Sequence, residues 1–301
     1  MSVLSRPEFH NEDAAYAYVE ARVWADGRVC PHCGECERTG KLNGASTRIG
    51  TYKCYSCRKP FTVKIGTIFE SSHVPMSLWL QAIYLIAASK KGISSNQLHR
   101  TLGVTLKTAW FMLHRIREAM RDDGDMVFGS GGGVVEVDET CIGREPGVQV
   151  KSAYHHKMKV LTLVDRSTGR AKNIITDNLK ASTLVPVLRE NIAKEAIAYT
   201  DEARQYARLD QSFADHDFTS HIAGGYVRGD VHTNTDAGYF SIFKRGMKGI
   251  YQHCGKGHLH RYCAEFASAT TTASPLGSTT TCAPIPPLWV SKRLTYQTVG
   301  T

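Results

Sequence analysis

Four cysteines stand in two pairs whose spacing is typical of a metal site. Cys30 and Cys33 form one Cys-x-x-Cys pair, Cys54 and Cys57 form the other, and twenty residues separate the pairs. Four thiolates at this spacing can close a tetrahedral Zn2+ site, and four unrelated buried cysteines would not be expected to repeat one spacing. Such a site leaves no coordination position open, so we predict a structural zinc ion. Cys36 breaks the spacing and is predicted to be a spare thiol.

Two aspartates follow apolar segments that are predicted to be β-strands. Asp138 follows Val134–Val137, and Asp201 follows Ala196–Thr200. If these strands are neighbours, the two carboxylates can hold a pair of Mg2+ or Mn2+ ions about 3.5–4 Å apart, the geometry of two-metal phosphoryl transfer. The alternative is that the acids simply end strands at the surface, which is common.

A basic helical region is a third candidate for function. Ser94 or Ser95 can cap a helix that Gly103 ends, and Thr105 can start a second helix. Two short helices joined by a glycine turn can place a recognition helix in the major groove of DNA. The alternative is a helical hairpin with a solvated basic face. The basic residues predicted to contact DNA here are Lys90, Lys91, Arg100, Lys107, Arg115 and Arg117.

The composition agrees with a partner of opposite charge. The chain has 301 residues and a formal net charge of +9, which favours a polyanion, nucleic acid first. No apolar run approaches the ~18–20 residues of a membrane helix, and the first residues lack the pattern of a secretory signal. Nine cysteines are an odd number, so we expect reduced thiols or metal ligands in a cytoplasmic protein.

The elements that must position these residues follow one another along the chain. Residues 1–75 are expected to hold a helix capped by Asn11 and the turn-rich cysteine region, and residues 76–122 are expected to be helical. A glycine-rich linker, 123–133, comes next. Strands are predicted at Val134–Val137, Lys159–Val164, Ala171–Thr176 and Ala196–Thr200, with a helix at Ala181–Ala193. This order indicates an α/β domain built on a mixed sheet.

A series of motifs carries a family resemblance. After the four-cysteine ribbon come Lys64–Glu70, Val135–Thr140, Tyr199–Glu202, Gly229–Thr235 and Gly238–Gly246. Over about residues 10–266 the chain resembles the zinc-ribbon DDE transposases of bacterial insertion sequences, the fifteen-ninety-five family. The resemblance implies an RNase H-like catalytic domain over residues 134–266, divalent metal ions, and cleavage and strand transfer at the element's terminal repeats and in target DNA. We also expect a homo-oligomer on double-stranded DNA, associated with the bacterial nucleoid.

The resemblance also assigns roles to single residues. Asp138 and Asp201 match the first two metal-binding carboxylates, and Lys244 matches a basic residue that would contact DNA. The third acid would fall at position 237, which is Ala237. Asn234, Asp236 or no residue at all can take its place; on a helix Asn234 lies on roughly the same face as position 237, whereas Asp236 points about 100° away. The alternative function is therefore a catalytically inactive DNA-binding relic of such a transposase.

The C-terminal part departs from the family pattern. Ala267–Ser291 has no charged residue in 25 positions, and a family-like sequence returns only at Lys292–Thr298. Two compensating reading-frame shifts would produce such a segment, so residues 267–301 are predicted to be a disordered tail, with a natural uncharged linker as the alternative. Upstream of it, Lys244, Arg245 and Lys248 are predicted to contact DNA phosphates, with a solvated helix face as the alternative.

Overall fold

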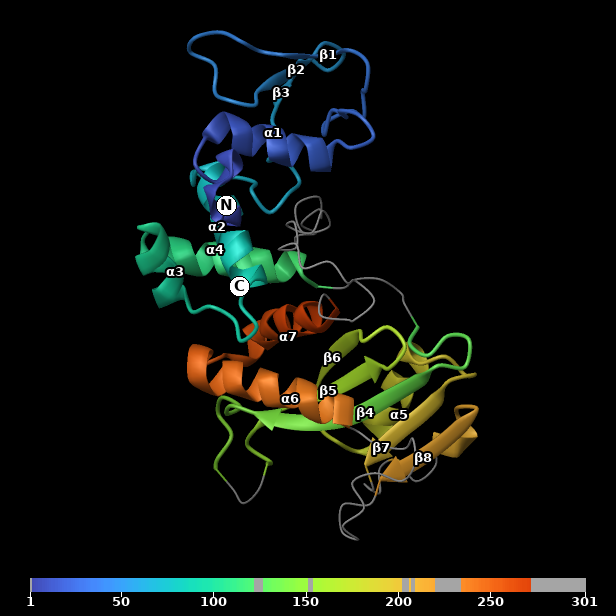
Figure 1. Cartoon of the computed structure of the whole chain (residues 1–301). Helices are drawn as coiled ribbons and strands as arrows, with labels where there is room; N and C mark the ends of the chain where they lie inside the picture. Colours follow the sequence, from blue (N-terminus) through green and yellow to red (C-terminus); the bar gives the residue numbers. More distant parts are fainter. Residues whose placement is uncertain are drawn as a thin grey trace. The chain divides into compact units, whose positions relative to one another are not determined.

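The computed structural model describes residues 2–121, 127–150, 154–201, 206, 209–219 and 234–271. These residues divide into two compact units, whose elements are labelled in Figure 1. The N-terminal unit holds residues 2–89 and 93–119. The C-terminal unit holds residues 90–92 and the described residues from 120 onward. Each unit has hydrophobic cores of its own.

The N-terminal unit opens with a capped helix and a small sheet. Helix α1 (Glu12–Val23) begins where predicted, because the Asn11 side chain accepts a hydrogen bond of 3.0 Å from the Ala14 N–H. The antiparallel sheet that follows has the order β1-β2-β3 and consists of β1 (Thr39–Lys41), β2 (Tyr52–Cys54) and β3 (Pro60–Phe61). Its core is small: buried Tyr52 and Phe61 pack with Trp24 and three of the cysteines.

Three helices complete this unit: α2 (Met76–Ala87), α3 (Ser95–Leu102) and α4 (Leu106–Ala119). The predicted turn between α3 and α4 is present. Ser94 caps α3 by accepting from the Gln97 N–H at 3.1 Å, and Gly103 ends it with a φ of 67°, in the left-handed region where glycine is favoured. The Thr105 hydroxyl accepts from the Thr108 N–H at 3.1 Å and so caps α4. The two helices therefore have the local geometry of a helix-turn-helix.

The C-terminal unit is built on a five-stranded mixed sheet with the order β6-β5-β4-β7-β8. Strands β4, β5 and β6 pair antiparallel, whereas β7 runs parallel to β4 and to β8. Helix α5 (Ala181–Asn191) precedes β7, so the predicted order of strands and helix is confirmed. The bounds are β4 (Val134–Ile142), β5 (Met158–Asp165), β6 (Ala171–Thr176), β7 (Ile197–Asp201) and β8 (Asp215–Thr219).

The structure changes two expectations about these strands. Strand β4 continues to Ile142, so Asp138 lies in the middle of the strand and not beyond its end, because β4 pairs with β5 along its whole length. Strand β8 was not predicted. It pairs only with β7 and carries Asp215 and Asp217, so it lacks the apolar pattern by which a central strand is recognised.

Both faces of the sheet are covered. On one face, Val135 and Val137 pack with Leu184 and Leu188 of α5. On the other, β4 and β5 pack against α6 (Asn234–Gly246) and α7 (Lys256–Thr271), joined by a π-helical turn at Met247–Tyr251. Figure 1 shows α6 and α7 together on one side of the sheet and α5 on the other. Alternate residues of β4 therefore face different cores.

The segments on either side of this unit differ from expectation. Phe128, in the predicted linker, is buried in the α5 core and pairs with Ile192, so the linker is anchored at this point, whereas residues 130–132 are exposed. Helix α7 reaches Thr271, five residues into the predicted tail. Residues 122–126 and 272–301, the rest of the linker and tail predictions, lie outside the described residues. Within the described part, no helix is long and apolar enough to cross a membrane.

Candidate functional site

The four paired cysteines meet in space with the dimensions of a zinc site. The sulfur atoms of Cys30 and Cys57 lie 3.8 Å apart, and those of Cys33 and Cys54 lie 3.6 Å apart. All four sulfur atoms lie within 4.8 Å of one another. Sulfur atoms at the corners of a tetrahedron with Zn–S bonds of about 2.3 Å lie about 3.8 Å apart, so the observed spacings fit one zinc ion.

Backbone hydrogen bonds shape the turns of the two knuckles. At the second knuckle the Cys57 N–H donates to the Cys54 sulfur at 3.5 Å, and this hydrogen bond lowers the pKa of the Cys54 thiol to about 7. At the first knuckle Gly34 has a φ of 77°, and its N–H donates to the Cys30 carbonyl at 2.9 Å. Cys36 is exposed and stands outside the group of four, as expected.

The second candidate site is a group of carboxylates on the central strands. Ligand oxygens of Asp138, Glu139 and Asp201 all lie within 4.8 Å of one another. Strand register explains the meeting of the two aspartates. Val134 pairs with Ile197 and Glu136 with Tyr199, so the same parallel register, continued by two residues, puts Asp138 level with Asp201. The structure therefore brings together the two aspartates singled out by the sequence.

The electrostatics of this group favour a bound cation. Burial raises the pKa of Asp138 to about 7, and the negative charges of Glu139 and Asp201 act in the same direction. The Glu139 N–H, which donates to Asp138 at 2.7 Å, and the cationic Lys244 oppose the rise in pKa. A divalent ion would remove the repulsion and the desolvation penalty together. The oxygen donors present are those that Mg2+ and Mn2+ prefer.

Glu139 is the member of the group that the sequence reasoning missed. Neighbouring residues in a strand point to opposite faces, yet the Glu139 carboxylate lies beside that of Asp138. The structure shows its carboxylate accepting a hydrogen bond from the Tyr206 hydroxyl. Tyr206 is only 1% exposed and belongs to the core under α5. The available sequence signal was the run of two acids inside an apolar strand.

The position predicted for the third acid falls at the start of α6. Asn234 is the first residue of α6, which puts Asp236 and Ala237 in its first turns, but the side chains of residues 234–237 lie outside the described residues. Lys244 lies further along the same helix and is exposed, with its ammonium group 5.3 Å from the centre of the Phe240 ring. Its charge acts on Asp138, so this helix presents a cation close enough to influence the carboxylate site.

A buried ion pair supports the same strand. Glu136, fully buried, accepts from the Arg166 guanidinium at 2.5 Å, and that guanidinium lies 4.8 Å from the centre of the Tyr199 ring. Glu136 and Tyr199 are register partners on β4 and β7. Arg166 therefore bridges the two strands that carry Asp138 and Asp201, two residues before each of them.

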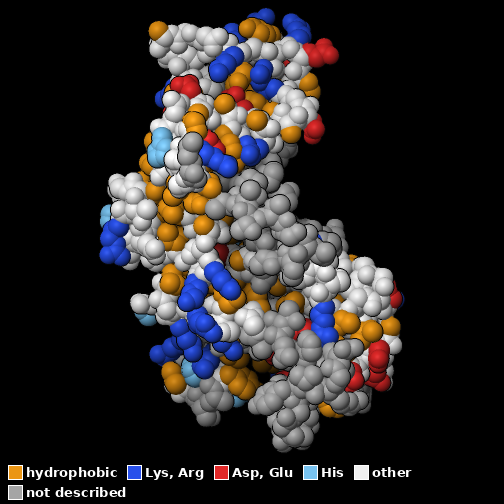
Figure 2. All heavy atoms as spheres, viewed as in Figure 1, with side chains coloured by type: hydrophobic (Ala, Val, Ile, Leu, Met, Phe, Trp, Pro, Cys, Tyr) orange, Lys and Arg blue, Asp and Glu red, His pale blue; other side chains and the backbone are white. Residues whose placement is uncertain are grey.

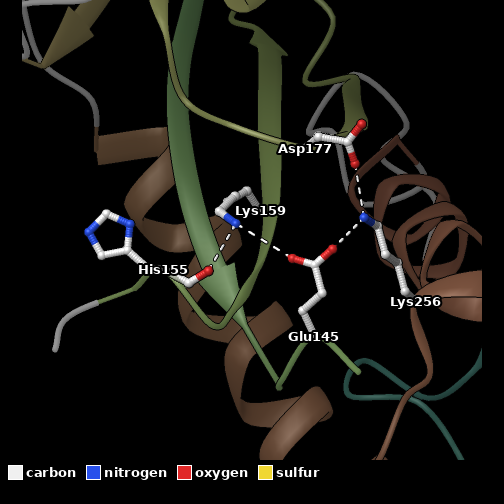
Figure 3. A network of polar contacts seen from close by, with 5 residues as sticks. All are labelled: Glu145, His155, Lys159, Asp177 and Lys256. Carbon is white, nitrogen blue, oxygen red and sulfur yellow. Dashed lines mark hydrogen bonds and ion pairs between the residues drawn. The ribbon is translucent and has the colours of Figure 1, made fainter. Parts of the chain in front are cut away.

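A second polar network fixes the segment that leaves β4 (Figure 3). The Glu145 carboxylate lies 3.7 Å from the Lys159 ammonium group and 2.5 Å from that of Lys256, which also contacts Asp177 at 2.9 Å. Lys159 donates to the carbonyl of His155 at 3.3 Å. The network joins the β4–β5 connection and the end of β6 to the first residue of α7, so it is structural.

The predicted DNA contacts divide into exposed and buried residues. Lys90, Lys91, Arg100 and Lys107 are exposed. Arg117 is only 1% exposed and donates to the Ile93 carbonyl at 3.4 Å, so its prediction as a phosphate contact is wrong.

Arg115 needs the same correction. This side chain is partly buried, and its guanidinium donates to the backbone carbonyls of Ile68, at 2.9 Å, and Glu70. The sequence does place basic residues in this region, but burial decides which of them can contact DNA. A guanidinium can donate to buried carbonyls as readily as it binds phosphate.

The basic residues of α6 and the turn after it form an exposed group. Lys244, Arg245 and Lys248 are all exposed. Figure 2 shows Lys and Arg side chains gathered on this face of the C-terminal unit. We call these three residues the α6 basic group.

The cysteine site yields a prediction about zinc. Cys54→Ser should remove most of the bound zinc, about one ion per chain in the wild type, and make residues 28–62 sensitive to protease, because the ribbon core is small and depends on metal. Cys36→Ser is the matched control and should keep full zinc content. Atomic absorption and limited proteolysis measure both; equal zinc content in the two variants would contradict the assignment.

The raised pKa of Asp138 yields a prediction about stability without metal. The unfolded carboxyl titrates near pH 4 and the folded one near pH 7. Between these values the folded state binds more protons, so the metal-free protein should lose stability as pH rises, by up to about 1.4 kcal/mol per pH unit. Asp138→Asn removes this loss and should stabilise the metal-free protein at pH 8 but not at pH 4. Thermal unfolding at the two pH values tests this, and equal effects at both would contradict it.

Comparison with known proteins agrees with both sites. Residues 131–267 match the ISXO2-like transposase domain of the IS1595 family, and residues 10–60 match the transposase zinc-ribbon domain of the same family. An uncharacterized protein in transposable element ISH50 of Halobacterium salinarum is 28% identical over 241 residues, which cover 74% of this chain and 79% of that protein.

Two solved structures show weaker similarity. One is the intasome of simian T-cell lymphotropic virus in complex with PP2A regulatory subunit B56 gamma, at 14% identity and a TM-score of 0.29, covering 67% of this chain and 71% of that chain. The other is the Mos1 strand transfer complex, at 10% identity and a TM-score of 0.22, covering 65% and 79%. At these TM-scores we take no structural detail from either. The two family matches fall on the two candidate sites: the chain contains the zinc-ribbon domain and the transposase domain of the IS1595 family.

Proposed function

We propose that this transposase binds the terminal repeats of its mobile element through the N-terminal unit and cleaves and joins DNA strands at the carboxylates of the C-terminal unit. The observation that carries the proposal is the meeting of Asp138 and Asp201 on neighbouring parallel strands, with Glu139 beside them. Hydrolysis of a phosphodiester at the element end frees a 3′-hydroxyl, which then attacks a phosphodiester of target DNA.

The roles of the residues follow from their positions. Asp138 and Asp201 would hold divalent ions, Mg2+ or Mn2+. When bound, such ions lower the pKa of water and neutralise charge on a reacting phosphate. Lys244, exposed on α6 and acting on the charge of Asp138, would hold a DNA phosphate beside the carboxylates. Arg245 and Lys248 would extend this contact along the backbone.

The N-terminal unit has features suited to reading DNA. At its start, α4 exposes Leu106, Lys107 and Trp110, and the preceding helix exposes Arg100. A lysine among exposed apolar side chains at the start of the second helix suits contact with both phosphates and base edges. Lys90 and Lys91, which belong to the C-terminal unit, precede these helices in the chain and would add phosphate contacts. The zinc ion at Cys30, Cys33, Cys54 and Cys57 would hold the ribbon in shape.

The biological setting remains a proposal. We propose that the protein acts as a homo-oligomer, because the two ends of an element must be processed together, and that it works on the bacterial nucleoid. The second candidate function is a DNA-binding relic without catalysis. Ala237 favours it, because this position supplies no ligand.

Strand cleavage tests the proposal most directly. Full-length protein should cleave a labelled duplex that carries its element's end in Mg2+ or Mn2+, and Asp138→Asn and Asp201→Asn should lower the rate at least about a hundredfold. Glu190→Gln, at an exposed position on α5, is the matched control. Wild-type cleavage no faster than Asp138→Asn, with cleavage restored by Ala237→Glu, would establish the relic instead.

Salt dependence of DNA binding tests the corrected set of contacts. Lys107→Ala should lower the slope of log affinity against log salt by about one, because one phosphate contact is lost. Arg117→Ala should leave the slope unchanged. It should instead lower the thermal stability, because it removes a hydrogen-bond donor from the buried Ile93 carbonyl. Fluorescence anisotropy with a mixed-sequence duplex measures both slopes. A reduced slope in Arg117→Ala together with an unchanged one in Lys107→Ala would reverse our assignment.

A further inference from the structure

We infer that Glu139 is a metal ligand of the catalytic site and that Tyr206 positions it. The inference rests on the proposed function, since it names a further residue of the same site. It supplies a third carboxylate from β4 itself, next to Asp138, in a chain whose position 237 is an alanine.

Distance is the first argument. The three ligand oxygens lie within 4.8 Å of one another. Oxygen ligands about 2.1 Å from one Mg2+ ion lie roughly 3.0 Å apart when adjacent and 4.2 Å apart when opposite, and two ions about 4 Å apart allow somewhat more. The observed limit is close to these spacings, so small side-chain rotations suffice for Glu139 to share an ion with Asp138 and Asp201.

Charge is the second argument. Two aspartates carry a charge of −2, which leaves a pair of divalent ions poorly neutralised at close range. Glu139 brings the protein's contribution to −3 at the place where the ions would sit. Without a cation, three neighbouring carboxylates in a partly buried site repel one another, because their oxygens lie within 4.8 Å.

The hydrogen bond from Tyr206 is the third argument. The Tyr206 hydroxyl donates to the Glu139 carboxylate, and the Tyr206 side chain is only 1% exposed. An ionised carboxylate has about four acceptor positions, and one bond from Tyr206 leaves capacity for a metal ion. A donor fixed in the α5 core therefore orients Glu139 as second-shell groups orient metal ligands elsewhere.

Binding of Mn2+ to the full-length chain, measured by calorimetry, tests the inference without depending on activity. Glu139→Gln keeps the shape of the side chain and should weaken Mn2+ binding at least about tenfold, as should Tyr206→Phe. Glu190→Gln should bind as the wild type does. Because Tyr206 acts through Glu139, adding Tyr206→Phe to Glu139→Gln should cause no further loss.

The outcomes separate this inference from the proposed function. If Glu139→Gln binds Mn2+ as the wild type does while Asp138→Asn does not, Glu139 is only a core partner of Tyr206 and the inference fails alone. If Asp138→Asn and Asp201→Asn also bind as the wild type does, the proposed function fails. An additive loss in the double variant would remove Tyr206 from its positioning role. Should Glu139→Gln fold poorly, Glu139→Asp offers a second test. It keeps the negative charge on a side chain that is one methylene shorter, so it should still weaken binding.

Discussion

Mutual repulsion among carboxylates at the middle of a sheet is the constraint on which the C-terminal unit depends. Asp138, Glu139 and Asp201 lie closer together than their charges favour in a partly buried place. The parallel register of β4 and β7 fixes the aspartates level with each other, and Arg166 ties those strands together two residues earlier. Helices pack on both faces of the sheet and oppose sliding of either strand. A shift by one residue would move every side chain of the strand to the opposite face, so Val135 and Val137 would leave the α5 core.

We infer opposite roles for metal at the two candidate sites. The four thiols belong to a ribbon with a very small core, so zinc bound there would couple metal binding to folding. The carboxylates belong to a sheet with two substantial cores, which can hold them in place against their repulsion. The carboxylate site therefore destabilises the metal-free fold and favours binding of a cation. Loss of stability in exchange for function is common at functional sites.

Much of this architecture could be predicted from the sequence, for specific reasons. Cysteine spacing is set by the ligand geometry of zinc, so the four ligands were evident, and glycine and hydroxyl caps marked the α3–α4 turn. Burial of charged side chains could not be predicted in the same way. Arg115 and Arg117 had the charge of DNA contacts, but tertiary packing used both to satisfy backbone carbonyls. Glu139 was not singled out, because its partner Tyr206 lies far along the chain and no local pattern marks the contact between them.

The most direct test of the account is the position of a metal ion in the protein. A crystal grown with Mn2+ should give an anomalous peak within about 2.3 Å of oxygens from Asp138 and Asp201, with a Glu139 oxygen in the same coordination sphere. An ordered Mn2+ ion elsewhere in the transposase domain, with these three carboxylates unbound, would contradict it.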